Sequence, residues 1–562
     1  MTQVISTNQQ LLETLNPSSL WKLFAQLSDI PRPSNDEEAV RQWIVNLVKM
    51  SNLVYKIDKI GNIAIYKPAQ NSSSLTKILL QAHMDMVTEK DPDHNHNFLH
   101  DPLKLQIIGD LVTATNTTLG ADNGIGLCAA LAVLIHTHIS HPPLEVLVTM
   151  NEEAGMVGIG KLDRTLISGD MIINLDCEEE GNVYVSSAGG RDIYIEMFAP
   201  RFEIKDKPLN SYERVGDPFW YASHLENWQV VEINLSGLSG GHSGADIHLE
   251  RINPLQELAN ILLRLPNTNY CFISIDGGNK LNAIPRDATA KIAFLANRAF
   301  SMDNQKPDGK INPEIYGKLQ TELEEFLATE SARLSQVESK AIITANWQGQ
   351  AKSGQKMWSN RTLGKFLHLI NSLPNGVIEM SHIISDLVQT SSNIGRISTD
   401  LDNGVINIGI MARSSDDYQL LKLGSQIESI VRLSSTGNPN LGDMSSYWES
   451  PTNQTFFDDF YRQNDFQAQV SFAGTKAGWK AQSSNTLLDK FQEVHKDLYG
   501  KEAKIMAIHA GLECGELSKY LPKADIISFG PDIRDAHTPR ENVSIRSVGE
   551  FYRLLVELLG RL

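Results

Sequence analysis

Acidic and histidine residues stand just after short apolar segments at several places along this chain, and this arrangement constrains its fold more than any other feature. A polar motif that follows a buried strand lies at the carboxyl end of that strand, where α/β proteins gather their sites. Imidazole nitrogens and carboxylate oxygens suit zinc, and a free carboxylate beside the metals can deprotonate a bound water. The arrangement therefore predicts a hydrolytic site with two zinc ions. The residues concerned are His83, Asp85, Asp122, Glu152, Glu153, Asp176 and His537.

Helix and strand patterns alternate through the first 180 residues. The segment Ser34-Asn35-Asp36-Glu37 has the form of a capping box and predicts a helix that continues to about Met50. Residues 125–135 are helix-like and separate the first two of three apolar runs that are typical of buried strands. This order predicts an α/β fold with a mostly parallel central sheet. The three apolar runs are residues 77–80, 144–148 and 171–175.

The middle of the chain carries further strand and helix patterns but none of this chemistry, which resumes only after about Thr475. Such a pause predicts an α+β domain inserted into a catalytic domain that closes on itself at the C-terminus. We place the catalytic domain at residues 1–190 and 466–562, and the inserted domain at residues 191–465. The polar stretch 301–312 is expected to be a surface insertion. The strand patterns are 230–235, 271–275, 288–295 and 405–411, and the helix patterns are 253–265 and 418–431.

Charge and composition exclude several classes of function. Fifty basic against 67 acidic residues give a formal charge of −17, which argues against a nucleic-acid or anionic-membrane partner. The first fifteen residues lack the basic and apolar regions of a signal peptide, and no apolar stretch is long enough to cross a membrane. Four scattered cysteines with no CxxC spacing suggest neither a disulfide framework nor a thiolate zinc site. We therefore expect a cytoplasmic protein.

Each motif also has a simpler local explanation. In His83-x-Asp85 both side chains share one side of a strand end, so the imidazole can bind metal while the carboxylate holds its other N–H. Taken alone, such a pair arises by chance more often than not. Asp122 lies in a glycine-bounded turn before a helix, where an Asx turn that caps the helix would also fit. For Glu152-Glu153, one carboxylate can bind metal while the other acts as base, and the alternative is a solvated helix N-terminus.

Asp176 ends the apolar run Ile172-Ile173-Asn174-Leu175, and the acids at 178–180 after it are more typical of a solvated turn. The spacing of the four motifs together makes the simpler explanations improbable.

Longer strings of residues resemble the aminoacyl-histidine dipeptidases of the PepD type, also called cytosolic non-specific dipeptidases. This group lies within the large metallopeptidase family that includes aminoacylases and succinyl-diaminopimelate desuccinylase. The resemblance covers nearly the whole chain. It implies a di-zinc exopeptidase-type catalytic domain with an inserted α+β lid domain that binds substrate. Its strings are Leu20-Trp21, Ile30-Pro31-Arg32-Pro33-Ser34, Gly61-Asn62, 81–87, 117–126, Asn151-Glu152-Glu153, Asn174-Leu175-Asp176, 237–247, Asn282-Ala283-Ile284-Pro285 and 507–515.

The resemblance also implies a role for each site residue. His83 and Asp176 would be terminal ligands of one metal ion, and Glu153 and His537 of the other. Asp122 would bridge the two ions, and the peptide bond after it would be cis. Glu152 would be the general base, and Asp85 would hold His83.

Three further residues match positions of the family that contact substrate. His242, in Ser239-Gly240-Gly241-His242-Ser243-Gly244, would reach over the metals to polarise the scissile carbonyl and steady the oxyanion. Arg413 would clamp the terminal carboxylate of the substrate, and Asn282 would also bind substrate. Without the resemblance, a histidine among glycines is only a loop.

Some positions depart from the family pattern or draw attention without fitting it. Arg540 stands where the family usually has an aspartate before Glu541, which bears on the hydrogen bonding around His537. His94, His96 and His100 look like metal ligands, but they lie in a polar loop that varies in the family, and we do not expect them to bind metal. For His509 and Glu513 the sequence does not separate a supporting role from a place in the pocket.

The favoured function is a zinc-dependent dipeptidase that hydrolyses unblocked dipeptides, including Xaa-His. An N-acyl amino acid deacylase would use the same two metal ions without an anchor for a free α-amine. A catalytically silent metal-binding protein would show damage to the base or the ligands, all of which are present. Cobalt or manganese could substitute for zinc, and the resemblance leads us to expect a homodimer.

Overall fold

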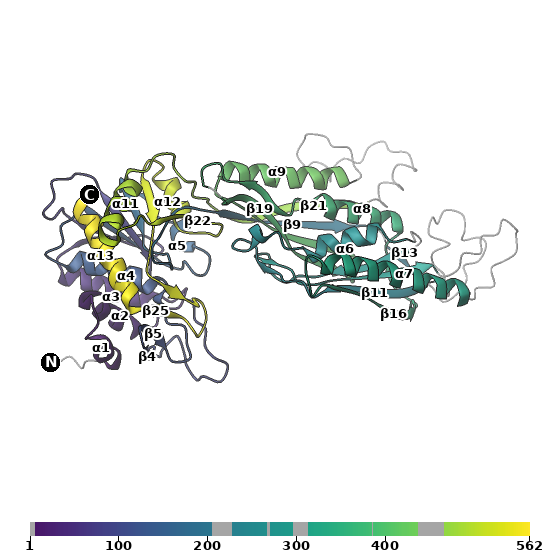
Figure 1. Ribbon diagram of the computed structural model, residues 1–562, viewed down its shortest axis with the longest axis horizontal. Helices are drawn as coiled ribbons and strands as arrows, with labels where there is room; N and C mark the ends of the chain where they lie inside the picture. Colours follow the sequence, from purple (N-terminus) through teal and green to yellow (C-terminus); the bar gives the residue numbers. More distant parts are fainter. Residues whose placement is uncertain are drawn as a thin grey trace. The chain divides into compact units, whose positions relative to one another are not determined.

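The computed structural model describes residues 6–199, 201–204, 228–266, 270–295, 313–384, 386–435 and 466–562, and these form two compact units (Figure 1). The first unit comprises Met1–Gly189, Ile383–Ser385 and Lys476–Leu562. The second comprises Gly190–His382 and Asp386–Thr475. The surface insertion expected at 301–312 lies outside the described residues.

A mixed sheet of eight strands is the centre of the first unit, in the order β1-β2-β6-β3-β7-β23-β8-β22. The pairs β6-β3, β3-β7, β7-β23 and β8-β22 are parallel, whereas β1-β2, β2-β6 and β23-β8 are antiparallel. The expected α/β fold with a mostly parallel centre is thus confirmed. The strands are β1 (Val54–Ile57), β2 (Ile63–Lys67), β3 (Ile78–His83), β6 (Leu144–Thr149), β7 (Met171–Asn174), β8 (Asn182–Ser187), β22 (Lys504–Ile508) and β23 (Asp525–Ser528).

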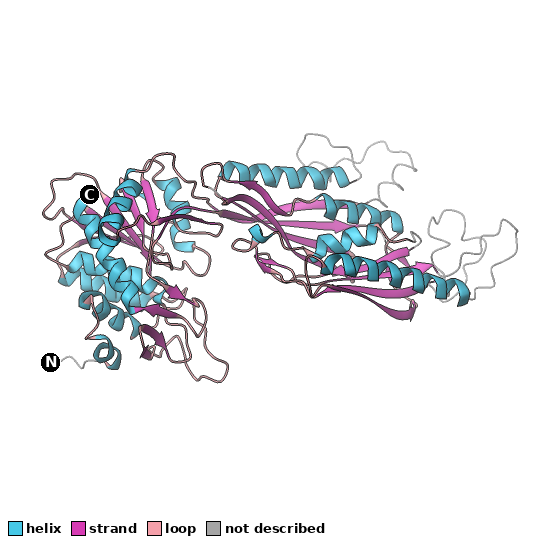
Figure 2. Ribbon diagram, viewed as in Figure 1, coloured by secondary structure: helices cyan, strands magenta, loops and turns pink. Residues whose placement is uncertain are grey.

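Both faces of this sheet are buried, which explains the mostly apolar runs in the sequence. In β3, Ile78 and Leu80 belong to a large hydrophobic cluster with the helices α2, α3, α4, α11 and α13, while Leu79 belongs to a smaller cluster with α12. Figure 2 shows these helices beside the strands. The helices are α1 (Thr7–Leu12), α2 (Ser18–Ser28), α3 (Glu38–Met50), α4 (Ala121–Ile135), α5 (Val157–Gly160), α11 (Thr486–Tyr499), α12 (Cys514–Tyr520) and α13 (Ile545–Arg561).

A second, four-stranded sheet in this unit brings the C-terminal segment close to the start of α4. Its order is β24-β25-β5-β4, and every pair in it is antiparallel. The strands are β4 (Leu105–Ile108), β5 (Leu111–Ala114), β24 (Ile533–Arg534) and β25 (Asn542–Ser544).

The capping box expected at Ser34 is wrong. The helix α3 begins at Glu38, and its N-cap Glu37 makes no capping hydrogen bond through its side chain. Asn35 has a left-handed backbone with φ of 70°, which turns the chain, and the Ser34 hydroxyl donates instead to Asp85 Oδ2 at 2.8 Å. The Ser34 hydroxyl thus binds the buried Asp85 carboxylate instead of capping the helix.

The second unit is α+β, as expected, with two main antiparallel sheets and its own hydrophobic core. The sheets have the orders β13-β15-β11-β16 and β18-β19-β20-β9-β21, with two-stranded pairs β10-β17 and β12-β14. The helices are α6 (Pro254–Leu263), α7 (Pro313–Ser335), α8 (Asn360–Ser372) and α9 (Asp417–Ser434). The strands are β9 (Gly189–Phe198), β10 (Phe202–Glu203), β11 (Trp228–Ser236), β12 (Gly241–His242), β13 (Tyr270–Asp276), β14 (Ala283–Ile284), β15 (Ala288–Leu295), β16 (Ile342–Gln350), β17 (Lys356–Met357), β18 (Gly376–Met380), β19 (Val388–Asp400), β20 (Val405–Ser414) and β21 (Gln467–Lys476).

The second domain boundary differs from the one we expected after residue 465. The strand β21 is an edge strand of the five-stranded sheet beside β9, so residues 466–475 belong to the second unit. Its exposed, alternating residues gave no apolar signal in the sequence. The first boundary falls at Gly189, one residue from the expected position.

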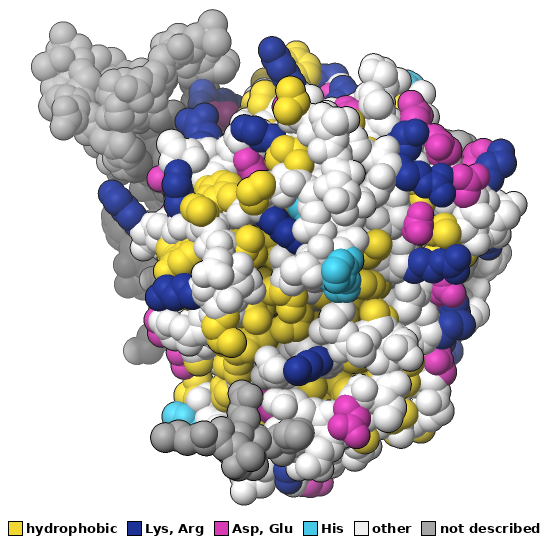
Figure 3. Space-filling view, turned by 90° about the vertical axis from the view of Figure 1, so that its left-hand side faces the viewer, with side chains coloured by type: hydrophobic (Ala, Val, Ile, Leu, Met, Phe, Trp, Pro, Cys, Tyr) yellow, Lys and Arg dark blue, Asp and Glu magenta, His cyan; other side chains and the backbone are white. Residues whose placement is uncertain are grey.

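On the face in Figure 3, basic and acidic side chains are interspersed with apolar ones, and the coloured residues form no single basic field. In the described part of the chain, none of the helices has the length and apolar character needed to span a bilayer.

Candidate metal centre

Three of the expected motifs meet because they follow neighbouring parallel strands. His83 is the last residue of β3, Glu152 and Glu153 come shortly after β6, and Asp176 comes two residues after β7. Since β6, β3 and β7 are adjacent and parallel, their carboxyl ends lie at one edge of the sheet. The first turn of α4 supplies Asp122. His537 lies in the loop between β24 and β25.

Asp122 stands between two groups of side chains and offers one carboxylate oxygen to each. Its Oδ1 lies 3.2 Å from His83 Nε2, which is also 3.4 Å from Asp176 Oδ1. Its Oδ2 lies 3.1 Å from His537 Nε2, which is also 3.1 Å from Glu153 Oε2. The peptide bond between Asp122 and Asn123 is cis, as the resemblance implied.

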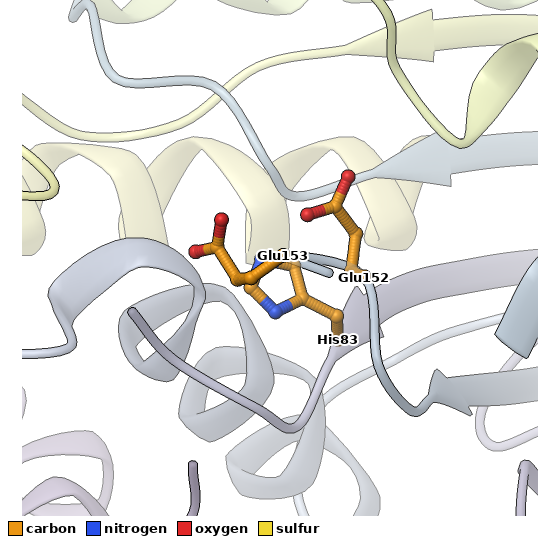
Figure 4. A group of neighbouring side chains, drawn as sticks. All are labelled: His83, Glu152 and Glu153. Atoms are coloured by element: carbon orange, nitrogen blue, oxygen red, sulfur yellow. The ribbon is translucent and has the colours of Figure 1, made fainter. Parts of the chain in front are cut away.

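The donor atoms fit a pair of divalent cations. They form three groups in which all the atoms lie within 4.8 Å of one another, namely His83-Asp122-Asp176, Asp122-Glu153-His537 and His83-Glu152-Glu153. Figure 4 shows Glu152 and Glu153 pointing to the same side of their loop, beside the ring of His83. The carboxylates of Asp122 and Glu153, which accept hydrogen bonds from the His537 ring, raise the pKa of His537 to about 11. Acids packed this densely around two imidazoles require positive charge, which two metal ions would supply.

The Glu152 carboxyl is set apart from the ordinary behaviour of a glutamate. Burial raises its pKa to about 7, and the charges of Glu153, Asp122 and Asp85 add to this effect against the opposing influence of His83. A carboxyl that titrates near neutral pH is suited to accept and return a proton in that range. The raised pKa of Glu152 is therefore compatible with the role of general base that the resemblance implies.

Asp85 uses both of its oxygens inside the protein. Its Oδ1 lies 3.3 Å from His83 Nδ1 and accepts the Glu152 N–H at 3.0 Å. Its Oδ2 accepts the Glu153 N–H at 3.1 Å, together with the Ser34 hydroxyl. Burial alone would raise the pKa of Asp85, but these partners lower it to about 2. Asp85 therefore connects the His83 ring to the backbone of the loop that carries Glu152 and Glu153.

The second unit gathers the other three expected residues in one place. His242 on β12 pairs with Ala283 on β14, so it is next to Asn282 across the two strands. Ser243 N donates to the Asn282 carbonyl at 2.9 Å, and Arg413 Nε donates to the Ser243 hydroxyl at 3.4 Å. Burial lowers the pKa of His242, and the nearby Arg413 charge lowers it further. The unit thus presents a histidine, an asparagine and an arginine as one group.

Among the described residues, none of the groups that could hold a metal contains His94, His96 or His100. His96 is instead packed against Phe98, with their ring centroids 4.5 Å apart. The side chain of Arg540 is exposed, and His537 keeps its contacts with Asp122 and Glu153 despite this departure from the family pattern.

Two residues near the site differ from what the sequence suggested or left open. Glu178 does not behave as a solvated acid, because burial raises its pKa to about 8, with Asp122 adding to the shift. Glu513 is fully buried, and its Oε2 accepts hydrogen bonds from Gln81 and from the Thr149 hydroxyl. These two donors lie on β3 and β6, so Glu513 contacts the strands that lead to His83 and Glu152.

Sequence reasoning missed the roles of Arg32 and Glu541, which are both about 2% exposed. Their partners are backbone atoms around Asp122, and a partner of that kind leaves no spacing pattern in a sequence. The only available signal was the place of Arg32 inside a string shared with the family and the place of Glu541 just after the departure at Arg540.

Comparisons with known proteins agree along the whole chain. The family model described as Peptidase family M20/M25/M40 matches residues 79–561. The cytosol non-specific dipeptidase of Escherichia coli (strain K12) is 33% identical over 550 residues, which cover 98% of each chain. The crystal structure of aminoacylhistidine dipeptidase from Vibrio alginolyticus is similar with a TM-score of 0.78 and 31% identity, covering 98% of both chains.

A tripeptidase from Staphylococcus aureus, with a TM-score of 0.52 and 13% identity over 97% of this chain and 98% of its own, shares the fold. The family match and the full-length identity lead to one conclusion: this chain belongs to peptidase family M20/M25/M40.

Proposed function

We propose that this protein hydrolyses unblocked dipeptides, including Xaa-His, with two zinc ions held by His83, Asp122, Glu153, Asp176 and His537. The observation that carries the proposal is the carboxylate of Asp122, which offers its two oxygens to two separate groups of donors. The family membership and the dipeptidases that resemble the chain over 98% of its length make it a hydrolase of peptide bonds. Imidazole nitrogens and carboxylate oxygens are among the ligands that zinc takes in proteins.

When bound, the two ions would acidify a water molecule and polarise the scissile carbonyl. Glu152 accepts the proton of the attacking water and later passes it to the leaving amine, a role that its pKa of about 7 supports. Asp85 holds the His83 ring and the Glu152 backbone in fixed positions relative to one another during these steps.

The group in the second unit would bind the substrate. His242 donates a hydrogen bond to the oxyanion that develops on the carbonyl. Arg413 binds the terminal carboxylate with its planar fork of N–H donors, and Asn282 adds a further polar contact. The link from Arg413 through Ser243 to the Asn282 carbonyl supports a shared function for the three residues.

Hydrolysis of free and N-acetylated Ala-His and Ala-Leu by the purified protein tests the proposal, with and without chelation and zinc add-back. We expect metal-dependent release of amino acids from the free dipeptides only, and the Ala-His to Ala-Leu ratio gives the breadth of specificity. Cleavage of the acetylated compounds alone would assign the protein to the deacylases. Absence of both activities in metal-loaded protein would favour the metal-binding alternative.

A cytoplasmic location and a homodimer also belong to this proposal. The location is supported by the name of the Escherichia coli relative, a cytosol dipeptidase. If His242 acts on the site of a partner copy, activity falls on dilution as the dimer dissociates. Full activity of a monomer proven by sedimentation would contradict action in trans.

A further inference from the structure

The turn that carries Asp122 is held between two buried charged side chains from distant parts of the chain. Arg32 comes from the N-terminal segment and Glu541 from the C-terminal segment, and each is about 2% exposed. Both contact the backbone of residues 119–122, but Glu541 binds N–H groups whereas Arg32 binds a carbonyl group.

Glu541 binds the N–H groups of the turn. Its Oε2 accepts from Leu119 at 2.8 Å and from Gly120 at 2.9 Å, and its Oε1 accepts from Ala121 at 2.8 Å and from Asp122 at 3.3 Å. These donors precede or open α4, so one carboxylate takes up N–H groups that the helix itself leaves without partners. Both oxygens act as acceptors, which is why a carboxylate is required here.

Arg32 binds carbonyl groups of the same turn and of the neighbouring strand end. Its guanidinium donates to Gly120 O at 2.5 Å, to Asp85 O at 2.7 Å and to Met84 O at 3.1 Å. Gly120 has a left-handed backbone with φ of 67°, and a Cβ atom added there would collide with the guanidinium of Arg32 and the side chain of Met86. The absence of a side chain at this position therefore allows Arg32 to reach the turn.

The two contacts join three of the five proposed ligands. Arg32 holds the backbone next to His83 and that of the Asp122 turn at once. Glu541 holds the Asp122 turn from a position four residues after His537, and its own N–H donates to Thr538 O at 3.0 Å. A shift of Arg32 would therefore move Asp122 relative to His83, and a shift of Glu541 would move Asp122 relative to His537.

We propose that Arg32 and Glu541 are positioning residues that fix the bridging carboxylate of Asp122 and thereby set the affinity of the site for its metal pair. This inference rests on the proposed metal site. Both side chains are buried against backbone atoms, so we expect the effect of changing them to fall on metal binding and on kcat rather than on KM. Changes to the partners that orient metal ligands lower affinity by about 10- to 100-fold.

The test uses Glu541→Gln, which keeps the shape of the side chain but turns an NH₂ group towards backbone N–H donors. We expect Glu541→Gln to weaken zinc binding by about 10- to 100-fold, measured by competition with a chromophoric chelator. The absorption spectrum of the cobalt-loaded variant should change, while KM for Ala-Leu at saturating zinc should match that of the unchanged protein. As a matched control, Glu180→Gln removes an acid from the exposed ion pair with Arg546 and should leave zinc affinity unchanged.

Arg32→Lys is the second variant, because it keeps the buried charge and alters only the contacts with the three carbonyl oxygens. If Glu541→Gln does not fold, as judged by circular dichroism, the zinc affinity of Arg32→Lys is measured instead. Folded variants that bind zinc as tightly as the unchanged protein would overturn the proposal. Failure of the proposed function is distinguishable, because zinc-loaded but inactive unchanged protein leaves the affinity comparison intact, whereas an unchanged protein that binds no zinc overturns both.

Discussion

Glu152 and Glu153 are adjacent in sequence, yet their carboxyl groups have different surroundings. Glu153 Oε2 lies 3.1 Å from His537 Nε2, whereas burial raises the pKa of Glu152 to about 7. We expect Glu152→Gln to retain both metal ions and to lower kcat by about 10²- to 10⁴-fold, because a general base contributes about that much. Metal content by mass spectrometry and steady-state kinetics check this. Turnover at the ordinary rate in a metal-loaded variant would remove Glu152 from the mechanism.

Glu513 predicts how the stability of the metal-free protein depends on pH. Burial raises its pKa from 4.5 to about 8, with the charge of Glu152 adding to the shift, so folding favours the protonated carboxyl. The stabilisation is therefore complete below about pH 4.5 and is lost as pH rises towards and through 8.

The neutral variant Glu513→Gln should remove this dependence. Its melting temperature should exceed that of the unchanged protein near pH 8 and approach it near pH 4.5, the two ends of the shift. Thermal melts of metal-free protein across this range provide the measurement. Parallel melting curves for the two proteins at every pH would contradict the prediction.

At the level of single residues, the sequence predicted which acids and histidines lie together better than it predicted the residues that hold them in place. His83, Asp122 and Asp176 come together as expected because they follow adjacent strands or begin the next helix. Arg32 was visible only as part of a family string, and Ser34 was interpreted as the start of a capping box. Their partners, a set of carbonyl oxygens and the Asp85 carboxylate, are chosen by the folded chain and not by sequence spacing.

At the level of elements, the sequence predicted the strands that are buried on both faces of a sheet but not the exposed ones. The strands β3, β6 and β7 are almost entirely buried and mostly apolar because helices cover both sides of their sheet. The strands β16 and β21 alternate between exposed and more buried residues, so no apolar run marks them in the sequence. The antiparallel place of β2 beside β6 depends on strand order, which local patterns do not contain.

The C-terminal helix α13 offers a test of the core of the first unit. Leu555 is fully buried in the large hydrophobic cluster, whereas Glu557 on the same helix is exposed. We expect Leu555→Ala to lower the free energy of unfolding by about 2–5 kcal/mol, because it leaves a cavity in a packed core. Glu557→Ala, the control, should stay within about 0.5 kcal/mol of the unchanged protein. Denaturant titrations measure both, and equal effects would contradict this description of the core.

At the level of the whole molecule, the two units have separate hydrophobic cores, and only the first contains the proposed metal ligands. Metal ions that bind a folded unit stabilise it by about 2.7 kcal/mol at a free concentration of 100 times Kd. We therefore expect chelation to lower the unfolding temperature of the first unit and to leave that of the second unchanged. Differential scanning calorimetry with and without EDTA measures this effect.

Two core variants assign the calorimetric transitions. Leu555→Ala should lower the transition of the first unit, and Leu423→Ala, a buried residue of α9, should lower that of the second. A shift of both transitions on chelation, or of neither, would contradict the restriction of the metal site to the first unit.

The pairing of β7 with β23 has a consequence for biosynthesis. Ser528 on β23 follows Asn174 on β7 by 354 residues, and a ribosome that adds about 5–20 residues per second needs roughly 20–70 s to cover that distance. During this interval the second unit is synthesised completely and can fold, while the edge of β7 that later pairs with β23 stays unpaired. His537 and Glu541 emerge later still, so a nascent chain has the acids of the site but not its last histidine. We therefore expect peptidase activity only after the segment that contains β23, His537 and Glu541 has been synthesised.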